Sequence, residues 1–155
     1  RIMPNIMAKY NKSQTFIFAK NKNILNKNFN KLMKSFGTNH FTSNEDQINI
    51  ATAVFGSGPA FIALMINSYL LAAKNLSKRS QLKDIDLINL FQNVLLNNQN
   101  SKDLENFLNS IASKKGTTQA GIKFLKSQNI KKIMYTTLDR AYKRARELSI
   151  EKESS

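Results

Sequence analysis

Apolar residues at helical spacing dominate the chain from residue 44 onward. The first helix of this part is predicted at 44–54, because Asn44 is a good N-cap and Glu45 and Asp46 suit the first turn. Further helices are predicted at 59–73, 80–97, 103–112, from Thr117 or Thr118 onward, and at 129–148. No strand pattern appears in these segments. The pattern predicts an all-α domain over residues 44–150, followed by a loose tail at 151–155.

Residues 1–43 have a different pattern. A β-branched and aromatic run at 14–19 predicts a short strand, and 39–42 predicts another. Between them, apolar residues at helical spacing predict a helix over 23–36, which Gly37 ends. The order strand, helix, strand indicates the last pieces of an α/β sheet whose other strands are absent. The fold class is therefore mainly α, with a short α/β segment in front.

The segment 59–73 is apolar on nearly every side. It is interrupted only by Asn67 and Ser68 and is expected to be too short to cross a membrane. A helix that is apolar all round is buried, and a chain of 155 residues has few partners with which to cover it. We therefore expect a second subunit against this helix. A core within one monomer is the alternative.

The net charge of +14 raises the possibility of a nucleic acid or an anionic surface as partner. Lysine outnumbers arginine 19 to 5, and asparagine and isoleucine are abundant, as expected from A/T-rich codons. Proteins that read phosphate or guanine favour arginine for its planar fork. Codon composition is the simpler explanation, so nucleic acid is not an expected partner.

Cysteine is absent, which excludes disulfides and thiolate metal sites and is consistent with a reducing, cytoplasmic location. His40 is the only histidine and is expected to pack or lie at the surface, so no metal site is predicted. The chain begins with Arg1, so the translation start is expected to lie outside this sequence.

The segment from Ser113 to Leu125 joins the end of one predicted helix to the start of another. Gly116 allows a sharp turn, and Thr117 or Thr118 is a suitable N-cap. A helix start presents unpaired N–H groups and the positive end of its dipole, which together can receive a carboxylate or phosphate. An ordinary capped helix start is the other explanation, and on pattern alone it is the commoner one.

This segment also resembles a known family. Ser113-x-x-Gly116-x-Thr118, followed by Gly121-Ile122 and Leu125, is similar to the C-terminal signature of pyrroline-5-carboxylate reductases. Two further blocks agree in order and separation, namely Gly56-Ser57-Gly58-Pro59-Ala60-Phe61 and Arg1-Ile2-Met3-Pro4-Asn5. The resemblance covers the second half of the family's length. It implies that residues 1–43 are the end of a dinucleotide-binding domain and that residues 44–150 are a dimerisation and substrate-binding domain.

The resemblance implies an enzyme that reduces 1-pyrroline-5-carboxylate to L-proline with NADPH or NADH, assembled as a dimer or higher homo-oligomer. Thr118 would be the catalytic residue, hydrogen-bonded to the substrate's ring nitrogen. The substrate-binding residues implied are Glu45, Ser113, Gly116, Thr117 and Thr118. Asn5 and Ser110 would lie on the cofactor side. A carboxylate at Glu45 would favour the iminium form of the substrate, although stabilisation of the helix dipole explains Glu45 equally well.

Several positions depart from the family pattern. Lys114-Lys115 replaces Pro-Gly in the substrate loop, Ile6-Met7 replaces Thr-Pro, and Phe55 replaces a small residue. Gly56-Ser57-Gly58 is not a dinucleotide fingerprint, since Phe61 takes the third glycine's place and a helix precedes the segment. These glycines are instead expected to permit close packing of helix against helix.

With the main cofactor-binding half absent, the isolated chain is expected to be inactive. A degenerate fragment that only oligomerises and a basic all-α nucleic-acid-binding protein are the alternatives.

Overall fold

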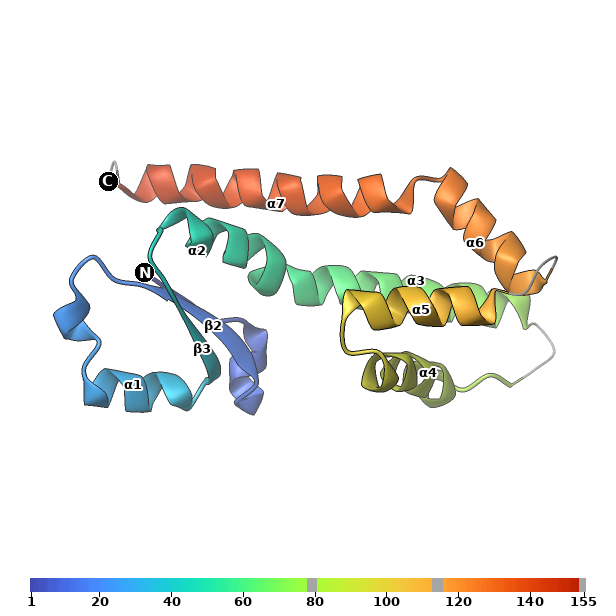
Figure 1. The fold of residues 1–155 in the computed structure, drawn as a ribbon, viewed down its shortest axis with the longest axis horizontal. Coiled ribbons are helices and arrows are strands. Elements are labelled where there is room, and N and C mark those ends of the chain that lie inside the picture. Colours follow the sequence, from blue (N-terminus) through green and yellow to red (C-terminus); the bar gives the residue numbers. More distant parts are fainter. Residues whose placement is uncertain (78–80, 113–115, 154–155) are drawn as a thin grey trace. The chain divides into compact units, whose positions relative to one another are not determined.

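Figure 1 shows the computed structural model, which describes residues 1–77, 81–112 and 116–153. Strands β1 (Ile2–Met3), β2 (Ser13–Phe18) and β3 (Gly37–Thr42) form the sheet. The helices are α1 (Lys27–Lys34), α2 (Asp46–Ala51), α3 (Gly58–Leu76), α4 (Asp84–Asn97), α5 (Ser101–Ile111), α6 (Thr117–Ser127) and α7 (Ile130–Glu153). The short turns are η1 (Ile6–Tyr10), η2 (Lys22–Ile24) and the π-helical η3 (Thr52–Gly56). The predicted fold class, mainly α with a short α/β segment in front, is confirmed.

The chain divides into two compact units. One consists of Arg1–Ile62 with Met134–Ser155, and the other of Ala63–Ile133. We describe each unit by itself. The first unit contains the sheet, α2 and the C-terminal part of α7, so the division by contacts does not follow the boundary predicted at residue 43. The predicted domain assignment stays a prediction.

The sheet of the first unit has the order β1-β2-β3. β1 pairs antiparallel with β2, and β2 pairs parallel with β3, with Ile17 opposite Phe41. The parallel pair is joined by α1, as the predicted strand, helix and strand required. In Figure 1, α1 lies on one side of the sheet and α2 on the other. The strand β1 was not predicted, because two residues are too few to show a period, and the short turn η1 was not predicted either.

Residue Gly37 does not end α1 but begins β3. The helix stops at Lys34, and Gly37 has φ 131°, a value that L residues rarely adopt. A Cβ atom at this position would lie 2.5 Å from the Ser13 carbonyl oxygen and 2.6 Å from the Ser13 nitrogen. Glycine is therefore required here, because the backbone of β3 passes directly against that of β2.

The helix α1 is shorter than the predicted span of 23–36. Asn26 caps it, since its Oδ1 accepts from the Phe29 N–H at 3.0 Å. Asn21 binds the Asn23 N–H in the same way at 2.9 Å and holds the preceding residues in the separate turn η2. These asparagine side chains compete with the helical hydrogen bonds, and hydrophobic spacing does not reveal that competition.

The core of the first unit forms where the sheet meets α2. Its buried members are Met3, Ile48 and Ala51, and Phe16, Phe18 and Phe55 pack against them. His40 is half-buried and stacks on Phe16 with ring centroids 4.7 Å apart. This is the packing position expected for that histidine.

Helical structure runs from α2 through η3 and, after a bend at Ser57, into α3. The resulting segment, Asp46–Leu76, has 31 residues and is long and apolar enough to cross a membrane. The prediction that this run is too short was wrong, because it counted from Pro59 and placed a helix boundary where the π turn η3 continues the helix. Length and composition are a weak criterion, since core helices of water-soluble proteins also meet it.

Within the single chain, α3 is not a buried helix. Gly58 is its only buried residue, and large apolar side chains on it are exposed, including Leu64 (66%) and Leu76 (90%). In the second unit, α3 contacts α4 through Tyr69 and Phe91, whose rings meet edge to face at 5.2 Å, and through the ion pair of Lys74 with Asp84. A monomer core that covers every face of α3 is therefore absent from the part of the chain that the structure describes.

The C-terminal tail is shorter than predicted. The helix α7 continues through Glu153 instead of ending at Leu148, so only residues 154–155 lie beyond the described chain. Arg144 pairs with Glu147 at 2.8 Å and with Glu151 at 3.3 Å along the same helix face. These pairs support the last turns, and the prediction did not consider pairing between basic and acidic residues along the helix.

Candidate functional site

The start of α6 is the predicted anion site. Its N-cap is Gly116, with φ −83° and ψ 168°, and no side chain caps it. The expectation of a threonine cap was wrong, because Thr117 is already the first helical residue. The φ of Gly116 is open to any residue, so no sharp glycine turn is needed there either. Ser113 and Lys114-Lys115 lie outside the described residues.

The amides of Thr117 and Thr118 precede the first hydrogen bond of this helix, which runs from the Ala120 N–H to the Gly116 carbonyl at 3.2 Å. A helix's own ladder does not use such amides. Beside them lies a shallow cavity of about 490 Å³. It is lined by Gly116, Gln119, Ala120, Ile122, Lys123 and Lys126. The two lysines and the positive helix end make this a suitable surface for a small carboxylate.

The side chain of Ser110 is used within its own helix. On the exposed surface of α5, its Oγ donates to the Phe107 carbonyl at 2.8 Å. A cofactor that hydrogen-bonds to Ser110, as predicted, would have to share this hydroxyl with the Phe107 carbonyl or replace the bond to it.

Asn5 connects the end of β1 to the π turn η3. Its Nδ2 donates to the Phe55 carbonyl at 3.1 Å, and its Oδ1 accepts from the Met7 N–H at 3.0 Å. Its backbone N–H donates to Ser13 Oγ at 3.0 Å. The side chain therefore fixes the entry to Gly56-Ser57-Gly58, in addition to any contact with a ligand.

Glu45 lies at the N-terminus of α2, the helix that leads into η3. Its Oε1 is 3.4 Å from Nη1 of Arg1, which also donates to Ser149 Oγ at 2.9 Å. The Nη2 of Arg1 donates to Asn49 Oδ1 at 2.9 Å. A cavity of about 530 Å³ opens beside this pair. It is lined by Arg1, Ile2, Met3, Glu45, Ile48, Thr52, Ala145, Leu148 and Ser149.

Glu45 and Asn5 are not brought together. Asn5 contacts Phe55, which follows Glu45 by ten residues, or about 15 Å at the helical rise of 1.5 Å per residue. A substrate the size of a pyrroline ring cannot contact both of these side chains. The predicted substrate contact of Glu45 and the predicted nicotinamide contact of Asn5 therefore describe two different places.

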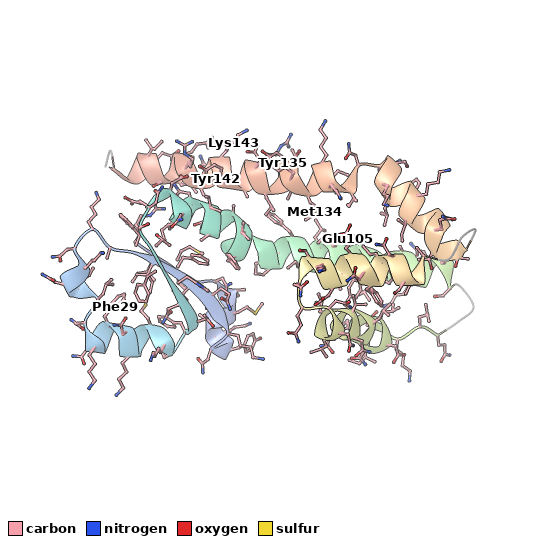
Figure 2. All side chains as sticks on the ribbon, viewed as in Figure 1. Phe29, Glu105, Met134, Tyr135, Tyr142 and Lys143 are labelled. Carbon is pink, nitrogen blue, oxygen red and sulfur yellow. The ribbon has the colours of Figure 1, made fainter. Side chains whose placement is uncertain are left out.

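The hydrogen-bond network around Asp46 was not predicted. Tyr142, labelled on α7 in Figure 2, donates through its hydroxyl to Asp46 Oδ2 at 2.7 Å. Asn49 Nδ2 donates to Asp46 Oδ1 at 3.0 Å, and Nε of Arg146 lies 3.8 Å from the same oxygen. The contact joins residues 96 positions apart, so local sequence patterns gave no signal for it.

These contacts change two pKa values in opposite directions. The Tyr142 hydroxyl first, and then the Asn49 amide, lower the pKa of Asp46, with smaller help from Arg146 and Arg1 against the effect of burial. The hydrogen bond to Asp46 raises the pKa of Tyr142. The network thus keeps a carboxylate and a neutral phenol in contact across the physiological pH range.

The described residues do not fit a dinucleotide. A pyrophosphate needs a glycine-rich turn between a strand and a helix. Gly56-Ser57-Gly58 instead follows a π turn, closed by the Ser57 N–H on the Thr52 carbonyl at 2.9 Å. A Cβ at Gly56 would lie 3.5 Å from Met3 Sδ, whereas one at Gly58 would meet nothing within 4 Å. The close packing of helix against helix expected at these glycines was therefore wrong: a Cβ at Gly56 would make only an ordinary contact with the side chain of Met3 on β1. The described residues also contain no cluster of metal ligands.

Comparison with known sequences places most of the chain in one family. The family described as "Pyrroline-5-carboxylate reductase dimerisation" matches residues 45–148. A pyrroline-5-carboxylate reductase of Staphylococcus haemolyticus is 33% identical over 152 residues, covering 96% of this chain and 56% of that protein. One of Staphylococcus saprophyticus is 31% identical, covering 99% and 57%. The chain thus spans little more than half the length of these curated relatives.

Solved structures agree. A pyrroline-5-carboxylate reductase of Coxiella burnetii superposes with a TM-score of 0.72 at 29% identity, covering 96% of this chain and 56% of that one. The enzyme of Streptococcus pyogenes gives 0.78 at 25% identity, covering 95% and 57%. The Plasmodium falciparum enzyme, solved with NADP bound, shares the fold with a TM-score of 0.78 at 22% identity, covering 93% and 56%. The chain belongs to the pyrroline-5-carboxylate reductase family.

Proposed function

We propose that this chain is the C-terminal part of an oxidoreductase that reduces 1-pyrroline-5-carboxylate to L-proline in the cytoplasm. Family membership and the share of its relatives' length that the chain spans support this proposal. The observation that carries the chemistry is the start of α6, where the amides of Thr117 and Thr118 precede the helical ladder beside Lys123 and Lys126.

In this proposal the substrate's carboxylate binds at the start of α6, on the amides of Thr117 and Thr118 and the segment from Ser113 to Gly116. The Thr118 hydroxyl hydrogen-bonds the ring nitrogen and so orients the C=N bond. Thr118 is half-buried at this position. Glu45 already forms an ion pair with Arg1, which gives its carboxylate a structural role. In this proposal the same carboxylate would favour the iminium form of the substrate, and the two roles are alternatives.

The cofactor is NADPH or NADH, which supplies the hydride. The described residues do not fit its pyrophosphate, so in this proposal it is bound mainly outside them, with Asn5 and Ser110 at its edge. The isolated chain should therefore not oxidise the reduced cofactor. Titration of the chain into NADPH should leave the nicotinamide fluorescence unchanged, and micromolar binding would contradict this part of the proposal.

The carboxylate site can be tested on the isolated chain by titration with L-proline, observed through backbone amide chemical shifts. We expect saturable shifts at Thr117 and Thr118. The start of α5 is a matched control, because Asn100 Oδ1 already accepts from the Lys102 and Asp103 amides at 3.0 Å. Pyrrolidine, which lacks the carboxylate, should shift neither helix start. Equal shifts with pyrrolidine, or none with proline, would rule out the carboxylate site.

The alternative is a fragment that only assembles with copies of itself. The exposed apolar side chains of α3 favour self-association, and they do so whether or not the chain takes part in catalysis. A homo-oligomer, dimer or higher, is therefore part of both proposals. The proline titration separates them, since a degenerate fragment would assemble but give no shift at α6.

A further inference from the structure

The outer face of α1 carries a stripe of lysines. Lys27, Lys31 and Lys34 stand four and three residues apart, so they project from one side of the helix. All three are exposed, while Met33 faces the opposite side and is only 4% exposed. In Figure 2, side chains ending in nitrogen extend from α1 away from the sheet.

This face has no acidic side chain from its own part of the chain. All ten acidic residues occur from Glu45 onward, whereas the preceding residues contain eight basic ones. None of the ion pairs among the described residues involves Lys27, Lys31 or Lys34. A bias in codon usage acts on the whole chain and does not explain this asymmetry. Among the described residues, no carboxylate therefore forms an ion pair with the stripe.

The stripe leads into a groove between α1 and the edge strand β3. This cavity of about 480 Å³ is lined by Asn30, Lys34, Gly37, Thr38, Asn39 and Phe41. Phe41 is 53% exposed, although it is an aromatic residue on a strand. Lys34 lines the groove and is also the last lysine of the stripe. An exposed ring and a row of positive charges therefore meet in one place, whereas the Asn30 amide already donates to the Leu25 carbonyl at 3.2 Å.

This combination matches the chemistry of unpaired nucleotides. A base can stack on an exposed phenyl ring, and lysines can attract successive phosphates. A base-paired duplex keeps its bases stacked and cannot offer one to Phe41. We propose that the groove binds single-stranded nucleic acid, with one base on Phe41 and the adjoining phosphates along Lys34, Lys31 and Lys27. This proposal does not depend on the reductase function.

The test is fluorescence anisotropy of a labelled single-stranded oligouridylate titrated with the chain. Phe41→Ala should weaken binding about 5- to 150-fold, the range for one stacked base. Phe41→Trp should retain the affinity. Because the chain has no other tryptophan, the fluorescence of Trp at this position should be quenched when the oligonucleotide stacks on it. Unchanged affinity in Phe41→Ala would overturn the proposal, provided that circular dichroism shows both variants folded.

The lysine stripe is tested through the salt dependence. Replacing Lys27, Lys31 and Lys34 together by glutamine should make the slope of log affinity against log salt shallower by about 2. Replacing Lys102, Lys131 and Lys132, which are exposed in the second unit, removes the same charge and should change the slope by less than half as much. Equal changes in the two triple variants would show attraction by net charge alone and would overturn the site. Binding to phosphatidylserine vesicles without binding to the oligonucleotide would also overturn the proposed nucleic-acid site.

Discussion

Gly37 shows how one residue constrains the sheet. Its φ of 131° and the 2.5 Å approach to the Ser13 carbonyl leave no room for a side chain. Gly37→Ala should lower the free energy of unfolding by at least about 2 kcal/mol, from backbone strain and the clash with β2. Urea denaturation measures this.

Gly121 provides the matched control for Gly37. It lies inside α6, and a Cβ there would meet nothing within 4 Å. Gly121→Ala should raise the free energy of unfolding by about 0.5–1 kcal/mol, because alanine favours helix. Equal destabilisation by both variants would contradict the constraint assigned to Gly37.

Tyr142 and Asp46 predict a pH dependence. The folded-state pKa of Asp46 is lowered, so its stabilising contribution is present above the unfolded pKa of about 3.9 and disappears as pH falls through the folded value. The pKa of Tyr142 is raised, so its contribution is present below about pH 10 and disappears as pH rises through the folded value.

Tyr142→Phe removes the hydroxyl from this network. At neutral pH the variant should melt about 2–4 °C below the parent chain, because Asp46 loses its shortest hydrogen bond. The difference in melting temperature should shrink as pH falls through the lowered folded-state pKa of Asp46, because below that pKa the carboxyl is protonated in both proteins. A difference that stays constant across this range would mean that the ring, and not its bond to Asp46, causes the effect.

At the scale of elements, asparagines set several helix starts. Asn100 caps α5 by accepting from the Lys102 and Asp103 amides. Asn26 starts α1, and Asn44 Oδ1 accepts from the Asp46 N–H at 2.9 Å, although the N-cap of α2 is Glu45 and not Asn44 as predicted. Asparagine is thus common at helix starts in this chain, where its side chain replaces the missing carbonyls.

Asn100→Ala should destabilise the second unit by about 1 kcal/mol, since two amides of α5 lose their acceptor. Hydrogen exchange at Lys102 and Asp103 should accelerate, with little change at α4. Asn100→Ser should restore most of the protection, because serine also caps. Failure of serine to restore it would argue against capping as the role of Asn100.

At the scale of the whole molecule, the exposed apolar surface of α3 predicts self-association. Leu64 and Leu71 are seven residues apart on this helix, and both are exposed. The chain should have at least the mass of a dimer in multi-angle light scattering. The variant with both residues changed to aspartate should shift towards the monomer, because buried charges oppose association.

Leu32→Asp is the control for the interface on α3. Leu32 is also an exposed leucine, but it lies on α1. This variant should keep the mass of the parent chain. If it dissociates as readily as the α3 variant, the interface does not lie specifically on α3.

The sequence by itself determined the fold class and the family. Apolar periods of three to four residues mark helices, alternation marks strands, and both follow from the chain's own geometry. The blocks around Asn5, Gly58 and Thr118 carried the family resemblance, because special backbone and polar positions restrict the choice of residue. Local patterns could also place the turn before α6, though not its cap, since the choice among Gly116, Thr117 and Thr118 depends on backbone angles.

Only the tertiary structure decided which distant residues meet. The bond of Tyr142 to Asp46, the approach of Gly37 to Ser13 and the contact of Asn5 with Phe55 join residues far apart in sequence. The structure likewise separated Asn5 from Glu45 and placed Phe41 at the end of a lysine stripe. Periodicity describes one element at a time, whereas these relations arise from how the sheet and the helices of the first unit pack against one another.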